Sequence, residues 1–225
     1  MDYVRDPDEI YRQSFEIVRA ETDLSGVPDD MTDVVIRLVH ACGMPEIAGD
    51  LRWSDDVASS AGSALGAGAP VICDAQMVAD GVIAARLPAD NQILSMIRLP
   101  NLVALAKEQG TTRSAAQVEL WKPFLPGSVV AIGNAPTALF RLLEVIAEDP
   151  SRKPAAILGF PVGFVGAAES KDALHDGAND GANNGASNGA NAGGHDVPYM
   201  TILGRRGGSA MAAAAVNALA GRTEA

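Results

Sequence analysis

Cysteine is scarce in this 225-residue sequence: the two cysteines, Cys42 and Cys73, lie far apart and form no metal-type pair. Neither a disulfide framework nor a zinc site is expected from them. Long apolar runs are also missing, since the longest, near residues 212–216, is far shorter than the roughly 20 residues of a membrane-spanning helix. The N-terminal stretch MDYVRDPDE carries charges where a signal peptide would be apolar. We therefore expect a cytoplasmic protein without a membrane partner.

Lysine is scarce as well, with 4 lysines against 13 arginines, and 28 acidic residues bring the formal net charge to −11. This charge argues against a nucleic acid partner, because binding a phosphate backbone requires a basic face. Four of the arginines fall at predicted helix ends or turns: Arg37, Arg113, Arg205 and Arg206. The planar guanidinium group suits carboxylates, although the codon usage of a GC-rich genome would give the same excess of arginine.

Familiar catalytic signatures are absent from the sequence. It contains no GxGxxG after a predicted strand, no Walker A motif, no GxSxG elbow and no HExxH. The segment GRRGGS, residues 204–209, offers main-chain N–H groups and two guanidinium groups to an anion at the start of a helix. Two glycines before a helix, however, more often form only a tight turn.

The first part of the chain, residues 7–66, is predicted to form three helices. They open at Pro7, Pro28 and Ser54, and the second ends at Gly43. Four apolar residues would make up the buried side of the first helix: Ile10, Phe15, Ile17 and Val18. We expect this segment to pack against an α/β core at about residues 69–222, so that residues 1–225 form one domain.

Five short apolar runs mark the core: PVICDA (70–75), QILSMI (92–97), SVVAIG (128–133), PAAILGF (154–160) and YMTILG (199–204). Continuous apolar runs of this length suit strands that are buried on both faces. Helical segments separate the runs, so the pattern predicts an α/β fold with a mostly parallel five-stranded sheet covered by helices on both sides. Ligands of such sheets bind beside the carboxyl ends of the strands.

One segment, DGANDGANNGASNGANAGG at residues 176–194, has no bulky apolar side chain. Such a composition cannot offset the entropy lost on ordering. We predict a mobile surface loop. A lid is the alternative, but the segment has no side chain that would hold a substrate.

His40 stands near the end of the second predicted helix, in the stretch IRLVHACGMPE, and Arg37 precedes it by one turn. The negative end of the helix dipole favours an imidazolium at this position, which suits a proton donor. A structural histidine between helix and sheet fits the residues equally well. Metal ligation is disfavoured, because the other histidines, His175 and His195, flank the predicted loop and offer no rigid geometry.

Seven blocks, in one order, resemble the precorrin-8X methylmutases of cobalamin biosynthesis: IYRQSF, VHACG, APVICDAQMV, TTRSAA, VVAIGNAPTALFRLLE, PAAILGFPVGFVGAAESKDAL and GRRGGSAMAAAAVNALA. The resemblance implies a flavodoxin-like three-layer α/β/α sandwich that works as a homodimer. It implies an isomerase that moves a methyl group from ring carbon 11 to ring carbon 12 of precorrin-8X, giving hydrogenobyrinic acid. No metal or organic cofactor is implied.

The resemblance also assigns roles to individual residues. His40 matches the family's proton donor, Ser14 and Arg37 match substrate contacts, and Arg113 matches a residue near the active site. Protonation of a ring nitrogen would ease the methyl migration, and arginines would bind the acetate and propionate groups of the macrocycle. Arg205 and Arg206 are added to the substrate-binding residues on this chemical ground. Structural roles remain open for two of them, with Ser14 as an exposed helix residue and Arg37 paired with Asp33.

Three other functions are compatible with these residues. A corrinoid carrier would bind the same ligand without converting it, and a cobalt-precorrin-8 methylmutase would act on the cobalt-containing substrate. A flavin- or phosphate-binding domain is the weakest alternative, because CDAQMVADG after the first predicted strand has no glycine-rich or Ser/Thr-rich phosphate loop.

Overall fold

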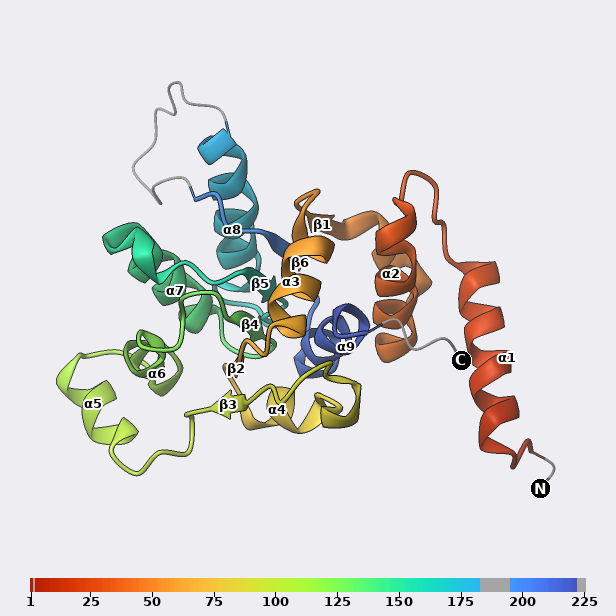
Figure 1. The fold of residues 1–225 in the computed structure, drawn as a ribbon, viewed down its shortest axis with the longest axis horizontal. Coiled ribbons are helices and arrows are strands. Elements are labelled where there is room, and N and C mark those ends of the chain that lie inside the picture. Colours follow the sequence, from red (N-terminus) through yellow and green to blue (C-terminus); the bar gives the residue numbers. More distant parts are fainter. Residues whose placement is uncertain (2, 183–194, 222–225) are drawn as a thin grey trace.

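The computed structural model describes residues 1, 3–182 and 195–221 of the chain (Figure 1). These residues form one six-stranded sheet in the order β1-β6-β5-β4-β2-β3. The strands are β1 (Leu51–Trp53), β2 (Val71–Cys73), β3 (Ile93–Ser95), β4 (Val129–Ile132), β5 (Ala156–Gly159) and β6 (Tyr199–Ile202). The five predicted strands are confirmed, and all of their pairings are parallel.

The sixth strand, β1, was not predicted. It pairs antiparallel with β6 at the edge of the sheet, with Leu51 opposite Ile202. Its three residues, one of them the partly exposed Arg52, do not form the apolar run that marked the other strands. Immediately after it, the main chain of Ser54 bonds to Tyr199, so the next helix, α3 (Val57–Gly66), begins three residues later than expected.

The order of the parallel strands is that of a doubly wound sheet. The chain passes from β2 outward to β3, then crosses back over β2 to β4 and continues to β5 and β6. The strand order therefore reverses between β2 and β4, which is where open sheets of this kind bind ligands. The flavodoxin-like α/β/α expectation is confirmed.

Helices cover both faces of the sheet (Figure 1). One face carries α3, α4 (Gln76–Gly81) and α9 (Ser209–Leu219), with α2 (Asp29–Cys42) packed outside α9. The other face carries α6 (Arg113–Trp121), α7 (Pro136–Glu148) and α8 (Ala167–Ala182), with α5 (Leu102–Glu108) beside α6. Short 3-10 helices complete the connections: η1 (Pro45–Asp50), η2 (Ala84–Arg86) and η3 (Pro150–Arg152).

Alternate strand residues divide between the two layers of the core. In β2, Val71 and Cys73 pack toward α2, α3, α4 and α9, whereas Ile72 packs toward α6, α7 and α8. The alanine-rich α9 lies very close to the sheet: a Cβ at Gly133 would be 2.6 Å from Cα of Ser209. Small side chains on both sides permit this distance, which fixes the end of β4 against the start of α9.

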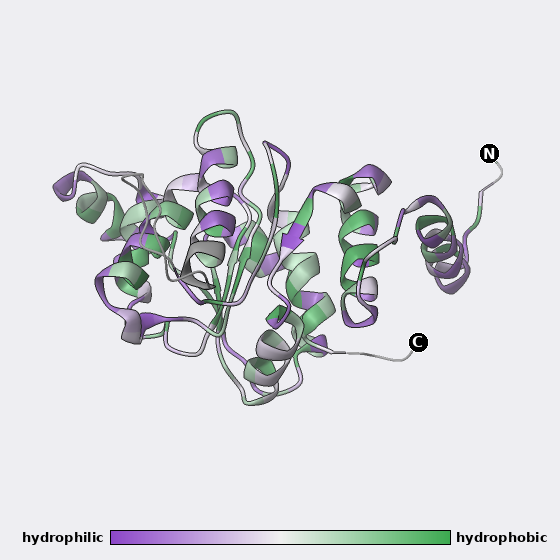
Figure 2. Cartoon of the chain, turned by 90° about the horizontal axis from the view of Figure 1, so that it is seen from above, coloured by the Kyte–Doolittle hydropathy of each residue, from purple (hydrophilic) through white to green (hydrophobic). Residues whose placement is uncertain are grey.

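The first helix, α1 (Pro7–Glu21), departs from the prediction. None of its fifteen residues, all of which the structure describes, is buried. Ile10 and Ile17, which were expected on a buried side, are 47% and 55% exposed, while Phe15 and Val18 are partly covered. Figure 2 shows α1 apart from the body of the molecule and beside α2. The amphipathic pattern of α1 is genuine, but this chain covers only part of its apolar face.

The segment 176–194, predicted to be a loop, is helical at its start. Helix α8 continues through Ala182, and residues 183–194 lie outside the described residues. Gly177 is buried against His195, whose main-chain N–H donates to the Gly177 carbonyl. Packing at that point extends the helix beyond the residues that its composition favours.

Candidate active site

The predicted catalytic histidine lies where α1 meets α2. Nδ1 of His40 is 3.0 Å from the hydroxyl oxygen of Ser14. Phe15, the next residue along α1, stacks on the imidazole with 4.6 Å between the ring centroids and 27° between the planes. The structure thus brings together Ser14 and His40, 26 residues apart in the chain, and fixes the plane of the ring.

The ring has one hydrogen-bond partner in the described part of the chain, and that partner occupies Nδ1. His40 is exposed and lies in the last turn of α2, which Gly43 ends at a φ of 69°. When the ring is protonated, Nδ1–H donates to Ser14 and Nε2–H remains available for a ligand. This arrangement suits a general acid.

Arg37 belongs to the same cluster. Its guanidinium carbon lies 5.4 Å from the centre of the Phe15 ring, which places the cation over the aromatic face. The predicted alternative, a pair between Arg37 and Asp33, is wrong, because Asp33 accepts from Arg19 of α1 at 2.7 Å. Across the described residues, no carboxylate forms an ion pair with Arg37. Its donors therefore remain available to a carboxylate ligand.

The other predicted arginines lie at the carboxyl edge of the sheet. Arg113 opens α6 and is exposed; the preceding residue, Thr112, bonds at 2.8 Å to Thr137 at the start of α7. Arg205 and Arg206 lie in the turn from β6 to α9. In the contacts of the described residues, none of these three touches the His40 cluster. The Arg206 side chain lies 3.6 Å from Glu46, a residue just after α2, the helix that carries His40.

The two glycines of GRRGGS adopt an extended backbone, and the turn in this connection lies at Gly204 and Arg205. Gly207 and Gly208 have φ values of 155° and 135°, and a Cβ at Gly207 would lie 2.4 Å from the carbonyl oxygen of Phe160. The N–H of Gly208 donates to that same oxygen at 2.8 Å. The glycines serve this close contact of two loops, and the predicted tight turn at these two residues is not formed.

An acidic residue, Asp74, occupies the point where the strand order reverses. Its buried carboxylate accepts from the main-chain N–H groups of Gly133, Asn134 and Ala135 at 2.9, 3.0 and 2.7 Å. Burial raises the pKa of Asp74, and these three donors oppose the rise. The carboxylate fills the N–H cradle at the start of α7, where a phosphate would bind in a nucleotide-binding sheet. Sequence reasoning missed this role, although an aspartate directly after a buried strand was a usable signal.

The remaining histidines are fixed rather than mobile, which corrects the prediction that they lack rigid geometry. Nδ1 of His175 lies 2.6 Å from the Tyr199 hydroxyl, and Nε2 of the buried His195 lies 3.0 Å from the Leu174 carbonyl oxygen. Burial lowers the pKa of His195. Within residues 1, 3–182 and 195–221, no group of three or more His, Cys, Asp or Glu side chains could hold a metal ion.

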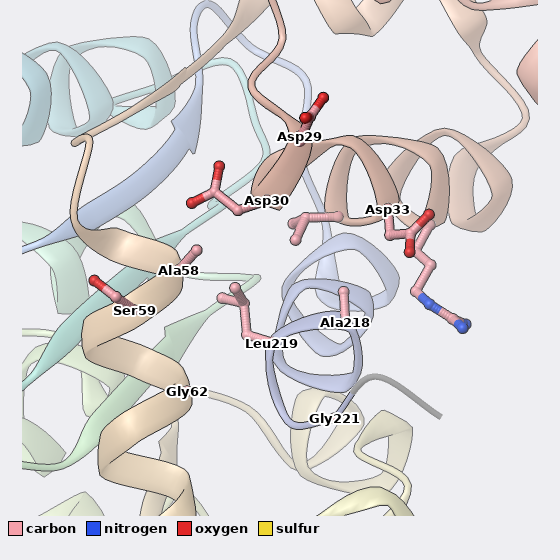
Figure 3. Close-up of a pocket in the computed structure, with 11 residues that line it drawn as sticks. Asp29, Asp30, Asp33, Ala58, Ser59, Gly62, Ala218, Leu219 and Gly221 are labelled. Atoms are coloured by element: carbon pink, nitrogen blue, oxygen red, sulfur yellow. The ribbon is translucent and has the colours of Figure 1, made fainter. Parts of the chain in front are cut away.

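A cavity of about 680 Å³ lies beside α2, α3 and α9. Figure 3 shows Asp29, Asp30 and Asp33 around its rim. Arg37 also lines it, whereas His40 and Ser14 do not. Three carboxylates create a negative potential that repels an anionic ligand. This cavity is therefore a poor site for a polycarboxylate.

Fold and site together define a class: a doubly wound, flavodoxin-like α/β protein with a serine–histidine pair between its N-terminal helices and with Asp74 in the usual phosphate position. Residues 9–222 match the family model of the precorrin-8X methylmutases (CbiC). The chain belongs to this family of isomerases, which confirms the resemblance found in the sequence. No helix in the described part of the chain is long and apolar enough to cross a membrane.

Named relatives agree with this assignment. The chain is 51% identical to the precorrin-8X methylmutase of Pseudomonas aeruginosa, with 100% of both chains covered. It is 53% identical to that of a Sinorhizobium species, over 97% of this chain and 96% of the relative. The solved structure titled precorrin-8X methyl mutase from Thermus thermophilus superposes with a TM-score of 0.78, at 34% identity over 94% of each chain.

Proposed function

We propose that this chain converts precorrin-8X to hydrogenobyrinic acid in cobalamin biosynthesis, with His40 as the proton donor. The observation that carries the proposal is the pair of His40 and Ser14, which orients an exposed imidazole in a member of this family. The reaction is an isomerisation: the bond from the methyl group to ring carbon 11 breaks, and its bond to ring carbon 12 forms. It needs no leaving group and no redox partner.

The proposed role of His40 is general acid catalysis. Nε2–H of the imidazolium donates to a ring nitrogen, the macrocycle becomes more electron-deficient, and the methyl group migrates more readily. The proton returns to Nε2 when the product forms. Ser14, proposed from the sequence as a substrate contact, is better suited to accept from Nδ1–H and so to hold the ring in place.

Arginines are proposed to bind the acid side chains of the substrate. Arg37 is next to the acid, and Arg113, Arg205 and Arg206 lie at the carboxyl edge of the sheet. A flat macrocycle with carboxylates on its rim can contact cations on several elements at once. The 51% and 53% identities to relatives named for precorrin-8X support the metal-free substrate.

We further propose that the active unit is a homodimer in which α1 helps to close the site. A helix of fifteen residues is marginal in water without packing. Ile10 and Ile17, one heptad apart, are half exposed on α1, which also carries Ser14 and Phe15. A second copy over this face would bury both isoleucines and cover the His40 cluster.

Cytoplasmic localisation is part of the proposal. Both cysteines, Cys42 and Cys73, are free thiols, as is usual in a reducing compartment. Burial raises the pKa of both thiols, that of Cys73 to about 12, which disfavours the reactive thiolate form.

The deciding experiment mixes purified protein with precorrin-8X and follows the absorption spectrum over time. Conversion to the hydrogenobyrinic acid spectrum is expected, and His40→Ala should lower kcat by about 10²- to 10⁴-fold. A spectrum that shifts once on binding and then stays constant would indicate a carrier instead. Turnover of cobalt-precorrin-8 alone would indicate the cobalt-dependent substrate.

The dimer is tested by Ile17→Glu, which should produce monomers in sedimentation experiments and lose turnover in parallel. Ile83→Glu is the matched control, because Ile83 is 49% exposed but lies outside α1. A monomeric wild-type protein with full activity would refute this part of the proposal.

A further inference from the structure

Lys171 is a fully buried lysine on α8, with 0% of its surface exposed. Lysines are almost never fully buried unless the ammonium is paired, because its desolvation is costly. Here Nζ donates to a main-chain acceptor, the carbonyl oxygen of Arg206. Such a residue requires an explanation other than core stability, since an apolar side chain of the same length would fill the space at lower cost.

The acceptor of Lys171 belongs to a pair of loops that are joined to each other, residues 160–166 and 203–208. Gly208 N–H donates to the Phe160 carbonyl at 2.8 Å, and Gly163 N–H donates to the Arg205 carbonyl at 3.3 Å. We call them the paired loops. Lys171 lies on the helix that follows the first loop and bonds to the second, so it links the pair to α8.

The paired loops carry two of the cations at this edge of the sheet, Arg205 and Arg206. The guanidinium of Arg205 lies 5.4 Å from the centre of the Phe164 ring, and Phe164 is 85% exposed. The Arg206 side chain reaches Glu46 and Asp50 only at 3.6 and 3.8 Å, both at exposed positions, where ion pairs contribute little. Main-chain hydrogen bonds hold the chain at Arg205 and at Gly208, and the contact from Lys171 adds a side-chain anchor at Arg206 between them.

We infer that Lys171 is a positioning residue: its buried ammonium holds the Arg206 carbonyl and thereby directs Arg205 and Arg206 toward the carboxylates of the substrate. The inference rests on the proposed function, which supplies a polycarboxylate ligand. It predicts that Lys171 contributes to substrate binding and not to the stability of the fold. Burial lowers the pKa of Lys171 to about 8, so the charge is a burden to folding, and its benefit lies in the geometry of the loop.

The test uses Lys171→Met in the full chain, with Lys153→Met as the matched control. Lys153 pairs with Asp196 and is partly exposed, away from the paired loops. For Lys171→Met, the KM for precorrin-8X should rise about three- to thirtyfold, with little change in kcat and no fall in Tm. Lys153→Met should leave KM unchanged. A Lys171→Met protein that keeps the wild-type KM, or loses Tm and kcat together, would overturn the inference.

A double-mutant cycle shows whether Lys171 acts through the arginines. In an Arg205→Ala/Arg206→Ala background, adding Lys171→Met should not raise KM further; an equal rise in both backgrounds would overturn the inference. If Lys171→Met does not fold, Lys171→Leu, which also removes the donor to the Arg206 carbonyl, is judged by the same criteria. If the wild type shows no turnover, the proposed function fails. The dissociation constant for hydrogenobyrinic acid then replaces KM in the cycle and decides the inference separately.

Discussion

Ser14 Oγ and His40 Nδ1 lie 3.0 Å apart across the contact of α1 and α2. A serine in this position can fix the tautomer and the plane of the imidazole. Its removal should therefore alter the chemical step more than substrate binding. We expect Ser14→Ala to lower kcat about tenfold with KM nearly unchanged, measured by steady-state turnover of precorrin-8X. Ser59→Ala, at an exposed serine of α3, is the control. A rise in KM with normal kcat would instead make Ser14 a direct substrate contact.

Arg37 should affect affinity more than stability, because its guanidinium lies over Phe15 and pairs with no carboxylate of the described residues. Replacing it with alanine should raise KM at least tenfold, which corresponds to the roughly 1.5–3 kcal/mol of a charged hydrogen bond. The free energy of unfolding in urea should change by less than about 1 kcal/mol. Arg19→Ala removes an exposed ion pair on the same two helices and should leave KM unaffected. Equal effects of the two substitutions would contradict a binding role for Arg37.

Asp74 should be one of the most sensitive positions for stability. Asp74→Ala leaves three N–H groups at the start of α7 without their acceptor, and we expect a loss of about 3 kcal/mol in urea unfolding. Added phosphate or sulfate should restore part of the Tm of this variant by binding in the emptied cradle. The wild type, whose cradle is filled, should gain less Tm from the same salt, because only the general stabilising effect of these anions acts on it. Identical salt responses would refute this account.

The lowered pKa of Lys171 predicts that the free energy of unfolding depends on pH. Its pKa in the folded chain is about 8, below the 10.5 of an unperturbed lysine. Between these values the unfolded chain binds a proton that the folded chain does not, so stability rises with pH across this window. Relative to Lys171→Met, the wild type should gain about 1–3 kcal/mol in urea unfolding from about pH 8 to about pH 10. Parallel stability curves for the two proteins would show that Lys171 is not destabilised by burial.

The parallel core was predictable because each strand is a run of consecutive apolar residues, such as Val129 to Ile132, and such a run suits burial on both faces. The short edge strand at Leu51–Trp53 lacks that signal, and only its pairing with β6 defines it. The burial of the apolar face of α1 was mispredicted for another reason. An amphipathic pattern shows that a face needs a partner, and it does not say which chain supplies one.

The candidate site was only partly accessible from the sequence. The family resemblance named His40, Ser14 and Arg37, but their geometry depends on how two helices pack. This packing alone places Ser14 against the imidazole. It also places Arg37 over Phe15 and not beside Asp33. The Lys171 contact joins residues 35 positions apart through main-chain geometry, which leaves no periodic trace in the sequence.

The filled cradle at Asp74 has a consequence for competition inside a cell. Nucleotides and their phosphates are abundant there, and many sheets of this topology bind a phosphate at this position. The Asp74 carboxylate already accepts from these N–H groups, so a nucleotide phosphate would have to displace an acceptor that belongs to the chain itself.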